Sequence, residues 1–283
     1  MKNFVWLVSY PKSGNTWFRI FLSNYLNNRS IPATLEEIES TPIAGNATLF
    51  EELTGLNPFE LTPEEVDFYR PEIYKFASRE IEGISYRKTH DAYTFNSNGE
   101  PLFPEDCTKA AIYFIRNPLD VCVSYANHSA SQVEKTIKLL LNEKGFIAGK
   151  RNGQLRQMLL SWKGHVESWQ NQTAIPIHFV RYEDMKLRPI EIFGTAIRFL
   201  GLEYDEERLI RSIGHSDFKL LQKMEEETGF NERLQNCKSF FWKGEIGNYR
   251  NYLSDNDIER IVDYNSGIMK KFGYLSADNK LEI

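Results

Sequence analysis

A short apolar run that stops at a proline and a glycine, and then resumes with helical spacing, is the feature that most constrains this chain. Residues 4–10 are rich in β-branched and aromatic side chains, Pro11 and Gly14 follow, and residues 16–26 carry apolar side chains three and four positions apart. This order predicts a buried strand, a tight loop and a helix. Such a loop gathers backbone N–H groups and the positive end of the helix dipole at one point, so it favours a small anion there.

Three further apolar runs predict strands at residues 84–88, 110–115 and 175–180. Two amphipathic patterns lie between the last two strands, and residues 145–153 separate them. One predicts a helix through Val133, Ile137, Leu140 and Leu141, and the other a helix through Leu155, Met158, Leu159, Trp162, Val166 and Trp169. Alternating strands and helices predict an α/β fold with a parallel sheet, whose ligands bind beyond the carboxyl ends of the strands.

The length and composition favour a single domain. The chain has 283 residues, 41% of them hydrophobic, and no linker-like stretch divides it. We therefore expect one domain over residues 1–283. Segments 30–58 and 128–153 are long for plain connections and are interpreted either as lids over a site or as ordinary surface structure.

The charge and the cysteines exclude several classes of protein. The net charge of −5 disfavours nucleic acid and anionic lipid as partners, although a local cluster of lysines can still bind a small anion. Cys107, Cys122 and Cys237 have neither CxxC spacing nor a nearby histidine, which argues against disulfides and a zinc site. No segment reaches transmembrane length, and a reducing cytoplasm fits this cysteine usage.

The loop itself carries the side chains that an anion needs. Lys12, Ser13, Asn15 and Thr16 supply donors, and Gly14 allows the backbone to come close to a phosphate. The loop is not a Walker A motif, in which the lysine follows the last glycine, because Lys12 here precedes Gly14. At the start of the turn, this lysine is placed to neutralise charge on a departing group.

The segment YPKSGNTW at residues 10–17 resembles the 5′-phosphosulfate-binding motif of cytosolic-type sulfotransferases. These enzymes use 3′-phosphoadenosine 5′-phosphosulfate (PAPS), and small bacterial members look most similar. The resemblance implies a P-loop-kinase-like α/β fold, with Lys12 to Trp17 on the nucleotide. It also implies sulfuryl transfer from PAPS to a hydroxyl, or less readily an amine, of a small-molecule acceptor, without a metal.

Further motifs of the same family recur in order. RKTH at residues 87–90 resembles the family's KTH segment, which makes His90 the general base and Lys88 the second sulfate-facing lysine; an imidazole suits this role because its ordinary pKa is near neutrality. RNPLDVCVS at residues 116–124 implies that Arg116 and Ser124 bind the 3′-phosphate. In an alternative interpretation, Asp120 pairs with Arg116 as a structural cap.

The remaining motifs concern adenine and the closing loop. RYEDM at residues 181–185 implies that Tyr182 contacts adenine, and a weaker match places Phe218 against the base. WKGEIGNYRN at residues 242–251 implies that Lys243 and Gly244 close over the 3′-phosphate. Trp242 stands where the family has arginine, and Asn248-Tyr249 where it has Asp-Trp, so we expect another cation, Arg233 or Lys238, to supply the charge.

Two rival functions and the acceptor stay open at this point. A P-loop kinase would need a Walker-type lysine and a carboxylate that holds Mg²⁺, and an inactive nucleotide-binding regulatory protein would need neither Lys12 nor His90. The family's dimerisation segment is not recognisable, so the oligomeric state is not predicted. The aromatic candidates for an acceptor pocket are Tyr86, Tyr93, Phe95, Tyr125, Phe146 and Trp162; in the alternative interpretation they are core residues, as aromatic side chains at helical or strand spacing usually are.

Overall fold

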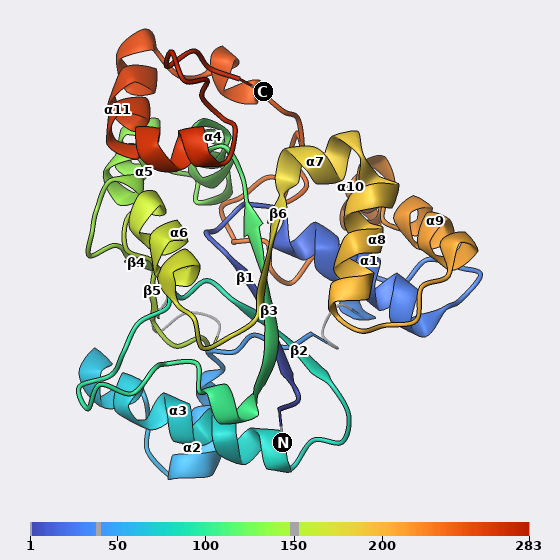
Figure 1. Ribbon diagram of the computed structural model, residues 1–283, viewed down its shortest axis with the longest axis vertical. Helices are drawn as coiled ribbons and strands as arrows, with labels where there is room; N and C mark the ends of the chain where they lie inside the picture. Colours follow the sequence, from blue (N-terminus) through green and yellow to red (C-terminus); the bar gives the residue numbers. More distant parts are fainter. Residues whose placement is uncertain (1, 38–40, 148–152, 283) are drawn as a thin grey trace.

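A four-stranded parallel sheet forms the centre of the protein in the computed structural model, which describes residues 2–37, 41–147 and 153–282. The strand order is β2-β1-β3-β6, and Figure 1 shows the helices on both sides of the sheet. The four strands are β1 (Phe4–Ser9), β2 (Ser85–Thr89), β3 (Thr108–Ile115) and β6 (Ile177–Arg181). All four predicted strands are therefore confirmed, with ends displaced by no more than two residues.

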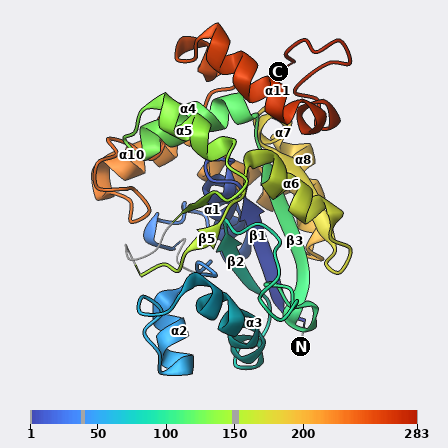
Figure 2. The ribbon, with the colours of Figure 1, turned by 90° about the vertical axis from the view of Figure 1, so that its left-hand side faces the viewer.

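Each face of the sheet is covered by its own group of helices (Figures 1 and 2). On one face, β1 side chains Val5 and Leu7 pack with Phe18, Phe21 and Phe193 from α1 (Asn15–Asn27) and α8 (Pro189–Phe199). The same side of the molecule carries α7 (Tyr182–Leu187), α9 (Glu206–His215) and α10 (Phe218–Thr228). Because both faces are covered, all six residues of β1 are buried, as expected for a central parallel strand.

The opposite face holds the larger core cluster. It packs Phe4, Trp6 and Val8 of β1 with residues of α4 (Pro118–His128), α5 (Val133–Leu140), α6 (Trp162–Asn171) and α11 (Asp255–Lys271). The helices α2 (Ala47–Thr54) and α3 (Pro63–Arg79) lie at the end of the molecule near the N-terminus (Figure 1). Short 3₁₀ turns include η2 (Glu105–Cys107) and η3 (Asn248–Asn251).

The helix predicted through Leu155 to Trp169 is wrong in its first half. The chain is extended there and forms β5 (Gln157–Met158), which pairs antiparallel with β4 (Phe146–Ile147). Leu160 has φ of 59°, which a helix does not tolerate, and the Ser161 hydroxyl caps α6 by accepting a bond from Gly164 N. Leu155 and Leu159 are buried all the same, in two different clusters, so the apolar spacing reflected burial and not a helix.

The carboxyl ends of the four strands lie at one edge of the sheet, since the strands are parallel and in register. Val8 pairs with Thr89 of β2 and with Tyr113 of β3, whose Ile115 pairs with Arg181 of β6. The chain leaves these ends into the phosphate loop, His90, Arg116 and Tyr182 respectively. The fold therefore brings four motifs that are far apart in the sequence to a common edge. No described helix is long and apolar enough to span a bilayer.

Candidate functional site

A cavity of about 750 Å³ opens at this edge, beyond the strand ends. Its walls come from the loop after β1, the first turns of α1, the end of β2, α4, α7 and the segment after α10. Most of the predicted site residues line it, namely Lys12, Gly14, Asn15, Thr16, Trp17, Lys88, His90, Arg116, Ser124, Tyr182, Phe218, Lys243 and Gly244. Ser13 is buried and is not among the lining residues.

The phosphate loop has a left-handed backbone at two positions. Lys12 has φ of 70° and Gly14, the N-cap of α1, has φ of 98°. A Cβ on Gly14 would lie 2.8 Å from side-chain atoms of both Tyr182 and Met185. Glycine is therefore required here for two reasons, the left-handed backbone and the close approach of the tyrosine predicted to contact adenine.

Buried polar atoms in the loop and beside it are suited to an anion. The Ser13 hydroxyl and Arg116 Nε are buried without a hydrogen-bond partner among the described residues, which is a costly state unless a ligand completes them. Asn15 does not supply the expected donor, because its Nδ2 donates to Leu7 O at 2.8 Å and to Ser9 Oγ at 3.3 Å and so ties α1 to β1. The Thr16 hydroxyl donates to Glu232 Oε2 at 3.3 Å, so the fit to a phosphate group rests first on Ser13, Arg116 and the backbone of the first helical turn.

Lys12 is the most strongly perturbed lysine of the cavity. Its pKa is lowered to about 7, chiefly by burial; the neighbouring Lys88 and Arg116 act in the same direction, and Cys237 and Glu232 oppose them. Its Nζ lies 3.7 Å from the centre of the Phe240 ring. An ammonium held in this way gains stability when an anion binds beside it, which favours a nucleotide phosphate or a sulfuryl group as the ligand.

His90 is held in one tautomer. Its Nδ1 lies 2.7 Å from Ser9 O, and because a carbonyl oxygen only accepts, Nδ1 carries the proton and Nε2 keeps its lone pair. Burial, and secondly Lys88, lower the pKa of this imidazole well below its usual range. The ring is therefore neutral at physiological pH and can accept a proton at Nε2.

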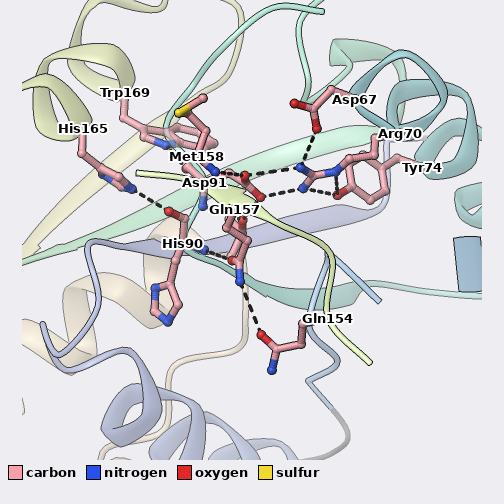
Figure 3. Close-up of polar contacts among 11 residues, drawn as sticks. Asp67, Arg70, Tyr74, His90, Asp91, Gln154, Gln157, Met158, His165 and Trp169 are labelled. Atoms are coloured by element: carbon pink, nitrogen blue, oxygen red, sulfur yellow. Dashed lines mark hydrogen bonds and ion pairs between the residues drawn. The ribbon is translucent and has the colours of Figure 1, made fainter. Parts of the chain in front are cut away.

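The backbone of His90 is fixed from both sides, as Figure 3 shows. Its N–H donates to Gln157 Oε1 at 2.7 Å, and its carbonyl accepts from His165 Nε2 at 3.0 Å. His165 is oriented in turn by Tyr113 Oη, which lies 2.7 Å from its Nδ1. Gln157 comes from β5, so the extended segment that sequence analysis had assigned to a helix positions the catalytic candidate.

The next residue, Asp91, anchors this region to the rest of the fold (Figure 3). Its buried carboxylate binds Arg70 Nη2 at 2.6 Å and accepts from Met158 N at 2.9 Å, and its carbonyl accepts from Trp169 Nε1 at 2.9 Å. Arg70 belongs to α3, Met158 to β5 and Trp169 to α6. Three elements thus converge on the residue that follows His90.

Two charged residues of the cavity wall were missed by sequence analysis, Arg19 and Glu232. The Glu232 carboxylate lies 2.8 Å from Lys88 Nζ and also pairs with Arg19 Nη1. Arg19 follows Thr16 by one helical turn on α1, so its position on the cavity side could have been inferred from that spacing. Glu232 lies 144 residues from Lys88 in the sequence, and no local pattern points to it.

The residues predicted to hold the 3′-phosphate and adenine also come together. The Arg116 guanidinium lies 4.2 Å from the centre of the Tyr182 ring, and Tyr182 Oη donates to Gly244 O at 2.9 Å. Gly244 has φ of 62°, and a Cβ on it would lie 2.5 Å from the Phe218 ring. Asp120 does not pair with Arg116 as the alternative interpretation held; its carboxylate accepts from Gly247 N and Tyr249 N at 2.8 and 3.0 Å.

Two expectations about the cavity wall are wrong. Arg233 and Lys238 do not line the cavity, and Arg233 pairs with Glu225 instead, so neither replaces the arginine lost at Trp242.

Of the aromatic residues suggested for the acceptor, only Tyr125 lines the cavity. The others are core residues or are exposed outside it: Tyr86, Tyr93 and Trp162 are buried, and Phe95 and Phe146 are exposed. Residues that belong to the walls but were not suggested include His128, Phe230 and Phe240.

Among the residues that the structure describes, no group of three or more His, Cys, Asp or Glu side chains is placed to hold a metal ion. The long segments that were interpreted as possible lids contribute Leu35, Pro42, Ile43, His128 and Ile147 to the cavity wall. Residues 38–40 and 148–152 of those segments lie outside the described residues.

Several characterised proteins resemble this chain. Luciferin sulfotransferase of Photinus pyralis is 24% identical to this chain, and the match covers 76% of this chain and 56% of the luciferin sulfotransferase. Cytosolic sulfotransferase 14 of Arabidopsis thaliana is also 24% identical, and the match covers 90% of this chain and 72% of the plant enzyme. The crystal structure of retinol dehydratase with androsterone and the inactive cofactor PAP superimposes with a TM-score of 0.63 over 99% of this chain and 82% of that one, at 17% identity. That similarity confirms the predicted fold class.

The sulfotransferase domain model matches residues 2–273. The match contains every motif on which the sequence-based expectation of a PAPS-dependent sulfotransferase rested, and it confirms that enzyme class. With a cavity that gathers those motifs at one edge of a parallel sheet and a family match over nearly its whole length, the chain belongs to the sulfotransferase domain family.

Proposed function

We propose that the cavity transfers the sulfuryl group of PAPS to a hydroxyl group of a small-molecule acceptor, with His90 as the general base. The observation that carries this proposal is the state of His90, whose proton is fixed on Nδ1 by Ser9 O while its ring lines the cavity beside Lys88. A neutral imidazole with a free lone pair on Nε2 is what the deprotonation of a hydroxyl requires.

The nucleotide would span the cavity between two groups of donors. The first turn of α1 with Ser13 and Thr16 suits the 5′-phosphate, because backbone N–H groups and the helix dipole favour an anion there. Arg116, Ser124 and Lys243 are assigned to the 3′-phosphate, and Tyr182, Trp17 and Phe218 to adenine. PAPS supplies an activated sulfuryl group on its 5′-phosphate.

In the reaction, each protein group would have one task. His90 Nε2 accepts the acceptor proton as the new S–O bond forms. Lys12 and Lys88 bind the sulfuryl oxygens and the departing phosphate, which positions the sulfuryl group. Their positive charges also stabilise the negative charge that develops during transfer, and this lowers the barrier. The bond that breaks joins sulfur to the bridging oxygen, so the products are the sulfated acceptor and adenosine 3′,5′-bisphosphate (PAP).

The cavity wall includes apolar side chains that are not assigned to the nucleotide. Ile43, Ile147, Tyr125, Phe230 and Phe240 are among them, which supports an acceptor with an apolar body. Retinol dehydratase was crystallised with androsterone, and another relative is named for luciferin. A hydroxyl on an apolar small molecule is accordingly the proposed acceptor class. A cytoplasmic location, one domain over residues 1–283 and lid movements of segments 30–58 and 128–153 remain predictions.

The decisive test is replacement of His90. His90→Ala should lower turnover roughly 10²- to 10⁴-fold with a weakly acidic acceptor, the range for loss of one positioned base. The acceptor is first found by a mass-spectrometric screen with PAPS for products that gain a sulfuryl group. PAP binding should survive, and His215→Ala, which changes a histidine outside the cavity wall, should keep full activity.

The loss should shrink with nitrophenols, whose hydroxyl needs less help to ionise. Added chelator should leave the rates of the wild type and of His90→Ala unchanged, because Lys12 and Lys88 are assigned the charge stabilisation; a kinase would stop. If His90→Ala transferred sulfuryl to a poorly acidic alcohol at the wild-type rate, the proposed mechanism would be refuted.

A further inference from the structure

Glu232 brings a carboxylate into contact with the two elements that carry the sulfuryl-facing groups. It follows α10, and its Oε2 lies 2.8 Å from Lys88 Nζ at the end of β2 and accepts a bond from Thr16 Oγ1 at 3.3 Å. Its Oε1 binds Arg19 Nη1, one turn further along α1. A single side chain thus joins the segment after α10 to both α1 and β2.

These ion pairs are shielded from water, which separates them from ordinary surface pairs. The side chains of Arg19, Lys88 and Glu232 are 3%, 11% and 17% exposed. Exposed pairs contribute little, whereas removal of one partner of a buried pair leaves an uncompensated charge. Removal of the Glu232 carboxylate would therefore leave the positive charges of Lys88 and Arg19 uncompensated.

We propose that Glu232 is a positioning residue for sulfuryl transfer, which holds the Lys88 ammonium at the transfer point and fixes the cavity-lining segment after α10 against α1. The inference rests on the proposed function, because it assigns Lys88 to the sulfuryl group. Glu232 is not proposed to contact the acceptor or to move a proton itself.

Several positively charged or titratable side chains share the cavity with Lys88. Arg19 from α1, Lys12 from the phosphate loop, and His90 and His128 from the ends of β2 and α4 all lie in the same cavity. Glu232 is the carboxylate that raises the pKa values of Lys88, Lys12 and His90, and Cys237 acts in the same direction on Lys12. Asp120, the other carboxylate among the described wall residues, binds backbone N–H groups of Gly247 and Tyr249.

The Glu232 charge changes the pKa values of Lys12 and Lys88 in the same direction. Burial lowers the pKa of Lys88 and of Lys12, and the Glu232 charge opposes this for both. Loss of the carboxylate therefore lowers both pKa values further, and each ammonium is lost at a lower pH. Because ligand binding to the free protein needs the ammonium form, affinity should begin to fall at a lower pH.

The test compares two nucleotides that differ by the sulfuryl group. Calorimetric titrations with PAPS and with PAP, without acceptor, are run between about pH 6.5 and 8.5 on the wild type and on Glu232→Gln, which removes the charge but keeps the shape. At the upper pH, Glu232→Gln should bind PAPS more weakly than the wild type, with about a tenfold loss for each unit by which the substitution lowers the lysine pKa. The loss for PAP should be smaller, because PAP has no group for Lys88.

A matched control comes from the same segment of the chain. Glu225 is also buried, and its carboxylate accepts from Phe240 N and Phe241 N and pairs with Arg233, outside the cavity wall. Glu225→Gln should loosen the segment without moving the pH profile of PAPS affinity. Glu232→Asp, which restores the charge on a shorter side chain, should recover the wild-type profile while turnover stays reduced.

The outcomes test the proposed function and the positioning role of Glu232 separately. If the wild type bound neither PAPS nor PAP, the proposed function would fail. If it bound both, and Glu232→Gln either kept the wild-type pH profile or bound PAPS more tightly at every pH, the positioning role would be overturned. Tighter binding would mean that the carboxylate competes with the sulfuryl group for Lys88. The same profile in Glu225→Gln as in Glu232→Gln would also overturn it.

Discussion

The buried ion pair behind the proposed base offers a sharp test of how the site is held. Arg70→Met removes the guanidinium that lies 2.6 Å from the Asp91 carboxylate. The carboxylate, which is fully buried, then keeps Met158 N and the Thr89 hydroxyl as its partners among the described residues. Removal of one partner of a buried pair destabilises proteins by about 3–5 kcal/mol. Against a total stability of about 5–15 kcal/mol, that is a large fraction.

Urea unfolding followed by circular dichroism measures this loss, provided that the slope of the transition is unchanged. The double variant Arg70→Met/Asp91→Asn removes both charges, while an amide oxygen can still accept from Met158 N. It should therefore be more stable than Arg70→Met by about 1 kcal/mol or more, because the uncompensated charge is gone. Turnover should fall in both variants, because Asp91 anchors the residue next to His90.

PAP binding should persist in the folded fraction of both variants, since Arg70 is not part of the cavity wall. A loss of stability below about 1 kcal/mol for Arg70→Met, the level of an exposed pair, would refute the view that this pair anchors the site. A double variant no more stable than the single one would show that the lost contacts, and not the charge, account for the effect.

The remaining predictions concern the nucleotide. PAP should raise the melting temperature far more than 5′-AMP, because Arg116, Ser124 and Lys243 are assigned to the 3′-phosphate; equal shifts in a thermal melt would contradict that assignment. Lys12→Ala should lower turnover more than PAP affinity, and Arg116→Ala should do the reverse, as steady-state kinetics and calorimetry can show. PAP affinity should fall as pH rises through about 7, where free Lys12 loses its proton, and this slope should be absent in Lys12→Met.

Local sequence was enough to locate the strands and the groups at their ends. Each of the four strands is a short apolar run, and in a parallel sheet such a run has only one edge at which ligands bind. The phosphate loop, His90, Arg116 and Tyr182 follow these runs directly, so their convergence needed no knowledge of packing. The direct sequence neighbours of each strand end were therefore predictable.

Contacts between distant segments were not predictable in the same way. Glu232 reaches Lys88 from the segment after α10, and Gln157 reaches His90 from β5, and neither residue lies in a distinctive local pattern. The helix expected through Leu155 failed because apolar spacing reports burial, which an extended segment also achieves when its backbone groups find partners. Here Met158 N binds the Asp91 carboxylate and Met158 O accepts from Ala92 N.

The charge distribution explains how an acidic protein can favour a small anion and disfavour a long one. The chain carries a net charge of −5, yet Lys12, Lys88, Arg19, Arg116 and Lys243 all line one cavity. Burial destabilises the charged form of these side chains, as the lowered pKa values of Lys12 and Lys88 show. An anion that enters the cavity stabilises the charged form and is therefore bound favourably. A polyanion cannot bring most of its charges into the cavity and meets the acidic surface instead. The site therefore selects anions by size as well as by charge, which suits a nucleotide that carries phosphate groups at two ends.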